Sequence, residues 1–479
     1  MNDRTPVHKR AGTHLLVVMA LLALLGGCAT LNPDERFAPV ERAARERLGK
    51  ELPRPVNAGD LDAHLDRVDQ RVTELLRAPL DAENAVQIAL LNNRGLQASL
   101  QELGIAEADL VSVSRLPNPG FSFAKLKRGD EREIERTFTL DLARLIALPF
   151  AAPAEQRRFA AVQRRVTLDM LALAAETRKA YYAAVAAAQS ARYAADVQDA
   201  ADTAAELARR MAQAGNFSKL QQAREQRFAA DAALNVARAQ QQEVAARERL
   251  TRLLGLWGDR IAFQLPERLP DLPAAAEERP DIEQQALAQR LDVEGARLQA
   301  EATASNLGLS RTTRFLNVLE LGYEHNTSNL EPRQTGYEIS IEIPLFDWGS
   351  ARVAGAEAVY MQSVHRAAQV AVEARSEVRE AYLRYRFAYD IARRYRDDVV
   401  PHARRVSEEN LLRYNGMLIG VFELLADARA QIAAVNAAIE AQRDFWMAKA
   451  DLDMAMVGKP LAAPLAVPAA AAGGAAPVH

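Results

Sequence analysis

The chain has 479 residues and a mass of 52.6 kDa, more than one ordinary compact core accommodates. Its 60 basic and 63 acidic residues give a formal charge of -3, so the basic excess typical of nucleic-acid-binding proteins is absent. A single cysteine excludes an intrachain disulfide framework, zinc fingers and iron–sulfur clusters. The mean hydropathy of -0.19 excludes a bundle of membrane-spanning helices.

The N-terminus has the pattern of an export signal. A basic start is followed by an apolar run from Leu15 to Leu25, which is too short to span a bilayer and fits the core of a signal peptide. The run ends in the sequence LGGC, which resembles a bacterial lipobox with Cys28 as its cysteine. We therefore expect a signal peptide over 1–27, a covalent lipid on Cys28 and no other cofactor. Because Ala29 follows, and not aspartate, the resemblance points to the outer membrane; in the alternative, the segment is an ordinary secretory peptide and Cys28 is incidental.

The first half of the mature chain begins with a tether and continues as a helical unit. Residues 28–80 are rich in proline and predict a lipid-anchored N-terminal tether with one helical stretch near Leu61–Leu76. Residues 81–258 then predict a first structural repeat, which consists of a helix, two strands and a long helical hairpin. Its first long helix is expected over 155–213 and its second over 217–254.

The second half repeats this plan. A proline-rich linker over 259–280 leads to a second structural repeat over 281–458. Landmarks in the two halves, such as Gly215 and Gly416, keep a separation of about 200 residues, which indicates an internal duplication. The tail 459–479 consists largely of alanine, proline and glycine and is predicted to be disordered.

Short segments near residues 121–142 and 315–343 alternate apolar and polar side chains, which predicts two strand pairs. The alternation fits an ordinary half-buried antiparallel sheet, and it also fits outer-membrane strands with an apolar face toward lipid and a polar face toward a lumen. In the membrane interpretation, the predicted lipid-facing residues are Phe138, Leu140, Tyr337, Ile339 and Ile341. Four strands cannot close a barrel, because even small barrels need about eight, and open edges are not viable in hydrocarbon. Several copies would have to pool their strands, and three copies would supply twelve.

The long helices favour an extended assembly. At about 1.5 Å per residue, the predicted helix 155–213 reaches roughly 90 Å, and a second over 350–414 reaches further. Such lengths are typical of coiled-coil-like packing. The alternative is a solid coiled-coil stalk without a lumen.

Four stretches together resemble the TolC-like outer-membrane efflux family, over about residues 75–458. They are Pro79 to Asn93, Leu116 to Pro119, Ile343 to Gly349, which resembles a strand-to-helix corner, and Gly416 to Ala428, which resembles a periplasmic tip.

The resemblance implies a fold that is mainly α with a β membrane part. Long antiparallel helices would form a trimeric α-barrel, and four strands per subunit would form a twelve-stranded transmembrane β-barrel. The segments 29–80 and 258–280, with part of the tail, would form an equatorial collar. The homotrimer would be a lipid-anchored exit duct in the outer membrane of a Gram-negative bacterium, with most of the chain in the periplasm. It would work with a periplasmic adaptor and an inner-membrane pump in a tripartite efflux, or type I secretion-like, system.

The resemblance places the periplasmic tips at the two interruptions of the helical hairpins. We expect the tips to dock the adaptor, with candidate residues Gly215, Ser218, Gly416, Leu418, Ile419 and Val421. Glu423 and Asp427 lie four residues apart on one helix face, and threefold symmetry would turn each into a ring of three carboxylates. They are the candidate periplasmic gate. In the alternative, both acids are solvated or pair with neighbours such as Arg224.

The sequence contains no catalytic constellation, so we do not expect an enzyme. The histidines are scattered, and no phosphate-binding glycine loop is present. Two other functions stay open: a periplasmic adaptor, which would show one helical hairpin and not two, and a structural coiled-coil lipoprotein. The stretch Val421 to Asp427 looks closest to members of the family associated with metal-ion efflux, yet there is no Met or His cluster, so no metal site is expected.

Overall fold

The structure is a computed structural model that describes residues 31–56, 58–315 and 318–459. The predicted signal peptide and Cys28 lie outside these residues, as does the predicted tail beyond Lys459. The chain divides into two compact units. The sheet unit comprises the described residues up to Pro39 and those within 102–164 and 294–370; the hairpin unit comprises the other described residues. Each unit takes segments from both predicted repeats, because the long helices continue from one unit into the other.

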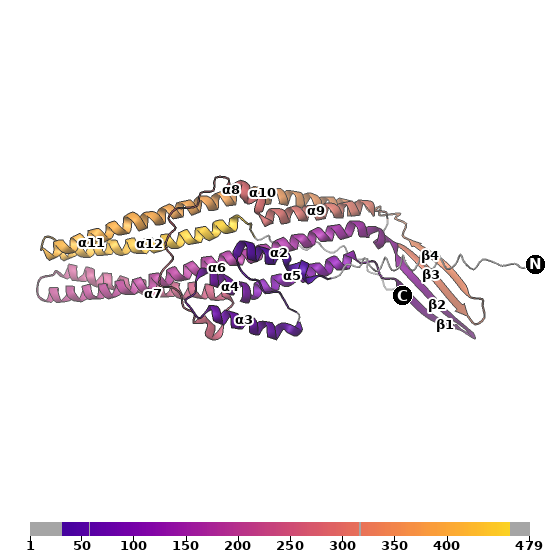
Figure 1. Cartoon of the computed structure of the whole chain (residues 1–479), viewed down its shortest axis with the longest axis horizontal. Helices are drawn as coiled ribbons and strands as arrows, with labels where there is room; N and C mark the ends of the chain where they lie inside the picture. The colour runs from indigo at the N-terminus through magenta and orange to yellow at the C-terminus, as the bar shows by residue number, and fades with distance from the viewer. Residues whose placement is uncertain (1–30, 57, 316–317, 460–479) are drawn as a thin grey trace, which may run out of the picture. The chain divides into compact units, whose positions relative to one another are not determined.

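The chain runs twice through the same order of elements, a broken helix, a strand pair and a long helical hairpin (Figure 1). The first pass consists of α4 (Ala82–Asn92), α5 (Arg94–Ser114), β1 (Gly120–Arg128), β2 (Glu131–Asp141), α6 (Leu142–Gln213) and α7 (Lys219–Leu254). The second consists of α8 (Ile282–Gln289), α9 (Leu291–Thr312), β3 (Leu319–Ser328), β4 (Gln334–Ile341), α10 (Ser350–Arg394), α11 (Val400–Asn415) and α12 (Val421–Ala455). Two further helices, α2 (Pro33–Ala43) and α3 (Leu61–Leu75), precede the first pass.

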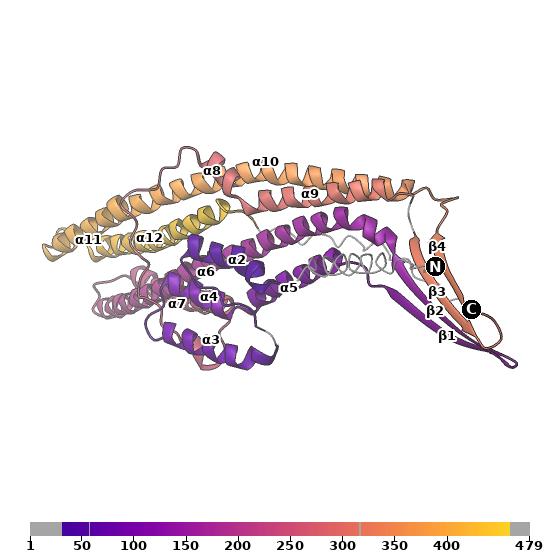
Figure 2. The same cartoon turned by 45° about the vertical axis from the view of Figure 1, so that its right-hand side comes forward.

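The sheet unit contains one antiparallel sheet in the order β1-β2-β3-β4 (Figure 2). Within this unit, helices α5, α6, α9 and α10 all connect to the same end of the sheet. The β1–β2 and β3–β4 turns lie at the other end. The two strand pairs are joined through β2 and β3, although some 180 residues separate them in sequence.

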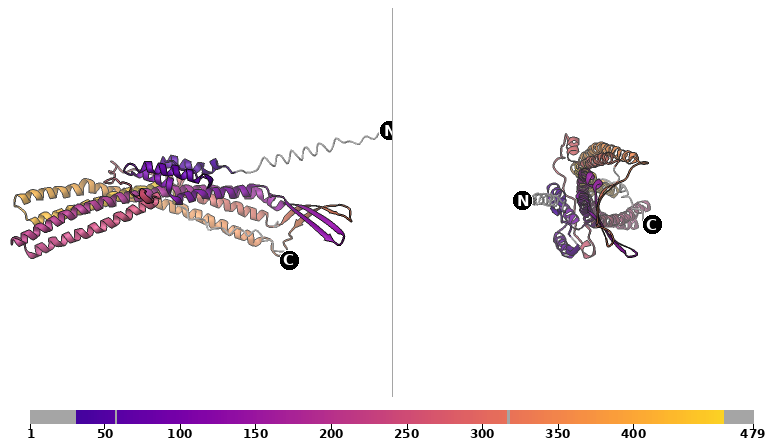
Figure 3. Two further views of the ribbon diagram at one scale, coloured as in Figure 1. Left: turned by 90° about the horizontal axis from the view of Figure 1, so that it is seen from below. Right: turned by 90° about the vertical axis from the view of Figure 1, so that its right-hand side faces the viewer.

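The hairpin unit pairs α6 with α7 and α11 with α12 (Figure 3). Its interior is made of two clusters. Around α4, α6 and α7 the buried residues include Ile88, Val185 and Leu250. Around α10 and α12 the aromatic rings of Tyr385 and Phe445 pack at 5.6 Å between centroids. Among the described residues, no helix combines the length and apolar content needed to cross a bilayer.

The structure corrects several expected boundaries. Helix α6 begins at Leu142, directly after β2, and not at 155, because the side chain of Asp141 accepts a hydrogen bond from the Arg144 backbone N–H (2.8 Å) and caps the helix. The predicted continuous helix 350–414 contains a π-helical turn at Tyr395–Val399, just before Pro401, which has no backbone N–H to donate.

Two further expectations at the chain's ends need correction. The predicted tether contains helix α2, which continues through Pro39 although this residue has no backbone N–H to donate. Lys459, the first residue of the predicted disordered tail, is held by hydrogen bonds to Asp292 and Glu377.

Candidate functional site

The strand register assigns the residues of the sheet to two faces, because neighbours along a strand point to opposite sides and paired residues share a side. One face carries an aromatic row across all four strands: Phe121 is opposite Phe138, Phe138 is opposite Tyr323, and Tyr323 is opposite Tyr337. Ring centroids are 4.9 Å apart in the first pair and 5.4 Å apart in the last. We call this side the apolar face.

All five residues that were predicted to meet lipid lie on the apolar face. Phe138, Tyr337, Ile339 and Ile341 are exposed, and Tyr337 reaches 83%. Leu140 is half-buried. Large apolar side chains rarely remain exposed side by side in water, so this face requires a cover.

The opposite side of the sheet carries the carboxylates, and we call it the acidic face. Seven acids of the four strands point to it: Glu131, Glu133, Glu135, Asp141, Glu320, Glu324 and Glu338. Its one basic strand residue is Arg128. A face with seven carboxylates is incompatible with hydrocarbon, because burying an unpaired charge there costs several kcal/mol or more. The acidic face must therefore meet water.

The sheet is open at both sides. Among the described residues, β1 and β4 each have one strand neighbour, so one edge of each exposes unpaired backbone groups. The apolar character continues beyond β4 into the predicted corner, where Ile343, Leu345 and Phe346 are exposed, Phe346 completely. Gly349 turns the chain here with φ +71, and a Cβ would lie 2.5 Å from the Arg314 carbonyl oxygen, so the corner requires glycine.

The first hairpin turn contains Gly215 and Ser218. Gly215 adopts φ +81, as the expected reversal requires. The Ser218 hydroxyl accepts from the Gln221 N–H (3.2 Å), while the Gln221 side chain accepts from the Ser218 N–H (2.7 Å). This capping box fixes the start of α7.

The second hairpin turn is built differently from the expectation. Gly416 has φ -79, and the left-handed conformation falls on Met417, with φ 58 and 94% exposure. The Leu418 N–H closes the turn on the Arg413 carbonyl (2.8 Å). Leu418 is exposed, Ile419 is half-buried, and Val421 is the first residue of α12. This tip therefore presents Met417, which was not predicted, beside Leu418.

The two candidate gate residues differ in environment. Glu423 is exposed, whereas Asp427 is half-buried and accepts a hydrogen bond from the Asn410 side chain on α11. The partner that the structure records for Asp427 is thus Asn410 and not Arg224. The residue after Arg224, Glu225, forms an ion pair with Arg429 on α12 (2.8 Å).

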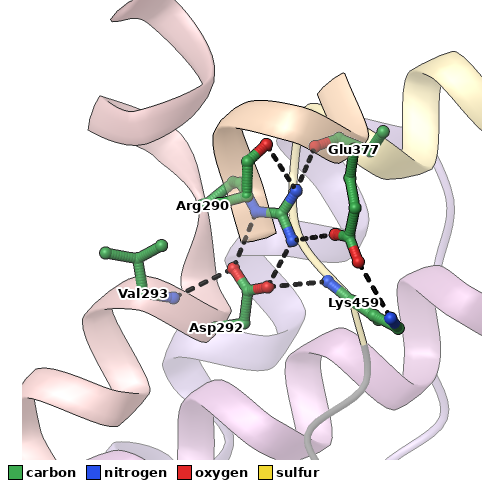
Figure 4. Close-up of polar contacts among 7 residues, drawn as sticks. Arg290, Asp292, Val293, Glu377 and Lys459 are labelled. Carbon is green, nitrogen blue, oxygen red and sulfur yellow. Dashed lines mark hydrogen bonds and ion pairs between the residues drawn. The ribbon is translucent and has the colours of Figure 1, made fainter. Parts of the chain in front are cut away.

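A buried ion network that the sequence did not predict lies at the break between α8 and α9 (Figure 4). The Arg290 guanidinium donates to Asp292 (3.0 and 2.5 Å) and Glu377 (2.8 Å), and Lys459 donates to the same two carboxylates. Burial opposes the charge of Glu377, but hydrogen bonds from Lys459 and Arg290 outweigh it and lower the pKa of Glu377 below its ordinary value.

The first pass has a comparable joint made of amides. Asn92 and Asn93, at the break between α4 and α5, donate to the carbonyls of Leu253, Leu254 and Gly255 at the end of α7. In both passes the helix break is thus tied to the end of the last helix of that pass, and only the second uses charges.

Comparison with known proteins finds a relative by sequence and further relatives by fold. The chain is 26% identical over 279 residues to the cobalt-zinc-cadmium resistance protein CzcC of Cupriavidus metallidurans, a match that covers 56% of this chain and 64% of that relative. The matched region thus spans somewhat less than two thirds of the relative's length. No protein-family profile matches the chain.

Among solved structures, the outer-membrane channel OprN is 17% identical with a TM-score of 0.66, and the match covers 96% of this chain and 98% of OprN. The outer-membrane channel MtrE of Neisseria gonorrhoeae, in its open state, is 18% identical with a TM-score of 0.65, over 79% of this chain and 89% of MtrE. The fold class predicted from the sequence, mainly long antiparallel α-helices with a four-stranded β part, is confirmed.

Proposed function

We propose that this chain, whose fold is that of the TolC-like outer-membrane efflux channels, is the outer-membrane exit duct of a tripartite efflux system. One observation carries the proposal: the sheet has an apolar face, an acidic face and two unpaired edges. Such a sheet is stable neither alone in water nor alone in lipid.

Pooling the sheets of several copies resolves the conflict. Strands β1 and β4 run antiparallel within the sheet, so β4 of one copy can pair with β1 of the next in an antiparallel ladder. Repeated around a closed ring, this pairing leaves no edge, turns the apolar face to lipid and the acidic face to a lumen. A homotrimer gives a twelve-stranded barrel, the size expected from the sequence.

The two hairpin turns are the proposed docking surface for a periplasmic adaptor, which would connect the duct to an inner-membrane pump. Exposed Met417 and Leu418 support this assignment, because apolar side chains at a water-exposed turn favour a protein contact.

Glu423 and Asp427 remain the proposed periplasmic gate. Since Asn410 already holds Asp427, Glu423 is the freer of the two acids to face a lumen.

The proposed cargo is cationic. The acidic face would give the lumen a negative potential, which raises the local concentration of cations. The name of the relative CzcC refers to cobalt, zinc and cadmium resistance, which is consistent with cationic cargo.

We further propose that Cys28 carries the lipid anchor. Mass spectrometry of the mature N-terminus tests this proposal, and an unmodified Cys28 would contradict it.

The function is tested by reconstituting the purified full-length protein in a planar lipid bilayer. A duct predicts heat-resistant oligomers in detergent and stepwise single-channel conductance. An adaptor or a structural coiled-coil lipoprotein predicts neither, so a monomeric protein without conductance would contradict the proposal.

A further inference from the structure

The apolar face has a second zone that the duct function does not explain. Four basic residues of the strands point to this face, and with His325 they occupy its turn half: Lys125, Lys127, Arg132 and Arg136. The seven acids of the strands all lie on the opposite face. The two faces of the sheet are therefore segregated by charge as well as by polarity.

Like charges lie directly opposite each other in this basic zone. Lys127 pairs with Arg132 across β1 and β2. Arg136 and His325 on β3 are not such a pair, because the Arg136 guanidinium donates a hydrogen bond to the His325 Nδ1 (3.4 Å). Directly opposed like charges destabilise a sheet, so an anion between them would be favourable. Within the part of the chain that the structure describes, the recorded ion pairs include none of the three exposed bases Lys125, Lys127 and Arg132.

The position of the basic zone identifies the kind of anion. The aromatic row of Phe121, Phe138, Tyr323 and Tyr337 separates the zone from the fully apolar half of the same face. Aromatic side chains gather at the boundary between hydrocarbon and headgroups in membrane barrels. The basic zone therefore falls at headgroup depth. Because the helices connect to the opposite end of the strands, it faces the outer leaflet when the helices are periplasmic.

We propose that the basic zone binds the phosphate groups of a phosphorylated glycolipid of the lipid A type in the outer leaflet. This inference rests on the proposed function, since it needs the apolar face to meet lipid. Lys and Arg pair strongly with phosphate, and Arg does so through two parallel hydrogen bonds. The bases come from β1 and β2, with His325 on β3, and therefore form one continuous outward surface and not a single strand edge. A lipid headgroup can cover such a surface, whereas a neighbouring copy that extends the sheet would pair with β1 or β4.

The test uses the purified full-length protein in detergent, titrated with fluorescent diphosphoryl lipid A. The variant carries Lys125→Gln, Lys127→Gln, Arg132→Gln and Arg136→Gln. The matched control is Arg128→Gln, which removes the one base of the acidic face next to the same turn. Because the variant removes four positive charges that would face the phosphates, we expect it to bind at least about tenfold more weakly than the parent. The control should bind as the parent does.

Two further arms separate the possible failures. Fully dephosphorylated lipid A should bind the parent about as weakly as diphosphoryl lipid A binds the variant, and millimolar inorganic phosphate should not displace diphosphoryl lipid A. Equal binding by parent and variant, or displacement by free phosphate, would overturn the lipid assignment.

The conductance of the same preparations is measured in phosphatidylcholine bilayers. A variant that still conducts but has lost the lipid A preference supports the inference, whereas absent conductance in the parent refutes the duct itself.

Discussion

Arg429 on α12 donates from one guanidinium nitrogen to both carboxylate oxygens of Glu225 on α7, at 2.9 and 2.8 Å, and so joins the two helical hairpins. Only 2% of the Glu225 side chain is exposed, against 36% for Arg429. The guanidinium also lies 4.3 Å from the centre of the Phe228 ring. This ion pair is therefore protected from solvent mainly on its acidic side.

The asymmetry predicts unequal costs for the two partners. Arg429→Ala should lower the free energy of unfolding by about 2 kcal/mol, because it leaves a buried carboxylate unpaired. Glu225→Gln should cost about 1 kcal/mol or less, because Arg429 can turn to solvent. Denaturant unfolding in detergent measures both. Arg227→Ala, which breaks an exposed pair with Asp231, is the control and should have almost no effect. Equal losses for the first two variants would contradict the burial argument.

Neighbouring residues of β4 should tolerate arginine very differently. Ile341 lies on the apolar face, and Ile341→Arg should cost roughly 2–4 kcal/mol if the residue is near the bilayer midplane. Ser340 lies opposite Glu320 on the acidic face, so Ser340→Arg gains a possible ion partner and should assemble normally. The yield of heat-resistant oligomer is the measurement. If both variants assemble equally well, the assignment of the faces is wrong.

The acidic face should make the lumen selective for cations. The combined change Glu320→Gln, Glu324→Gln and Glu338→Gln removes three carboxylates per chain without changing side-chain size. The reversal potential in a salt gradient should move toward that of a non-selective pore. A control that removes three exposed acids of α3, with Asp62→Asn, Asp66→Asn and Glu74→Gln, should leave it unchanged. A shift of the same size in the control would show that the overall charge of the protein, and not the acidic face, sets selectivity.

Acid should loosen the network around Arg290. Hydrogen bonds from Lys459 and Arg290, opposed by burial, lower the pKa of Glu377 from its ordinary value of 4.5. A carboxyl group with a lowered pKa stabilises the fold above its unfolded pKa, and this contribution disappears as the pH falls through the folded value. Glu377→Gln should therefore reduce the melting temperature at pH 7 and flatten its decline below about pH 4.5. The control Glu380→Gln, at an exposed pair with Arg384 on the same helix, should retain the parent's profile. Parallel pH profiles for parent and Glu377→Gln would contradict the assignment.

The elements that could be predicted from the sequence are those encoded by local patterns. Alternation in 134–142 and 337–343 predicted the strands and the common face of Phe138 and Ile341. The same alternation contains the charge segregation, since Glu131, Glu133 and Glu135 follow one another at every second position. This spacing alone would have predicted the acidic face.

The remaining features depend on contacts that local patterns do not contain. The network of Arg290, Asp292, Glu377 and Lys459 joins residues from three separate segments, and no motif links them. The turn at Met417 could not be predicted from Gly416, because the Leu418-to-Arg413 hydrogen bond places the left-handed residue one position later.

The central claim is that separate copies pool their sheets through β1 and β4. Two strands separate these edges within one chain, so their backbones are about 14 Å apart, too far for a disulfide, which needs Cα atoms within about 7 Å. In a Cys28→Ser background, one cysteine is placed at Ser122 or Ala124 on β1 and another at Gly336 or Ser340 on β4. Oxidation of the oligomer should give, for at least one of these pairs, a covalent ladder that ends at a trimer. If oxidation yields only monomers for every one of these cysteine pairs, the claim that β1 and β4 pair between copies is wrong.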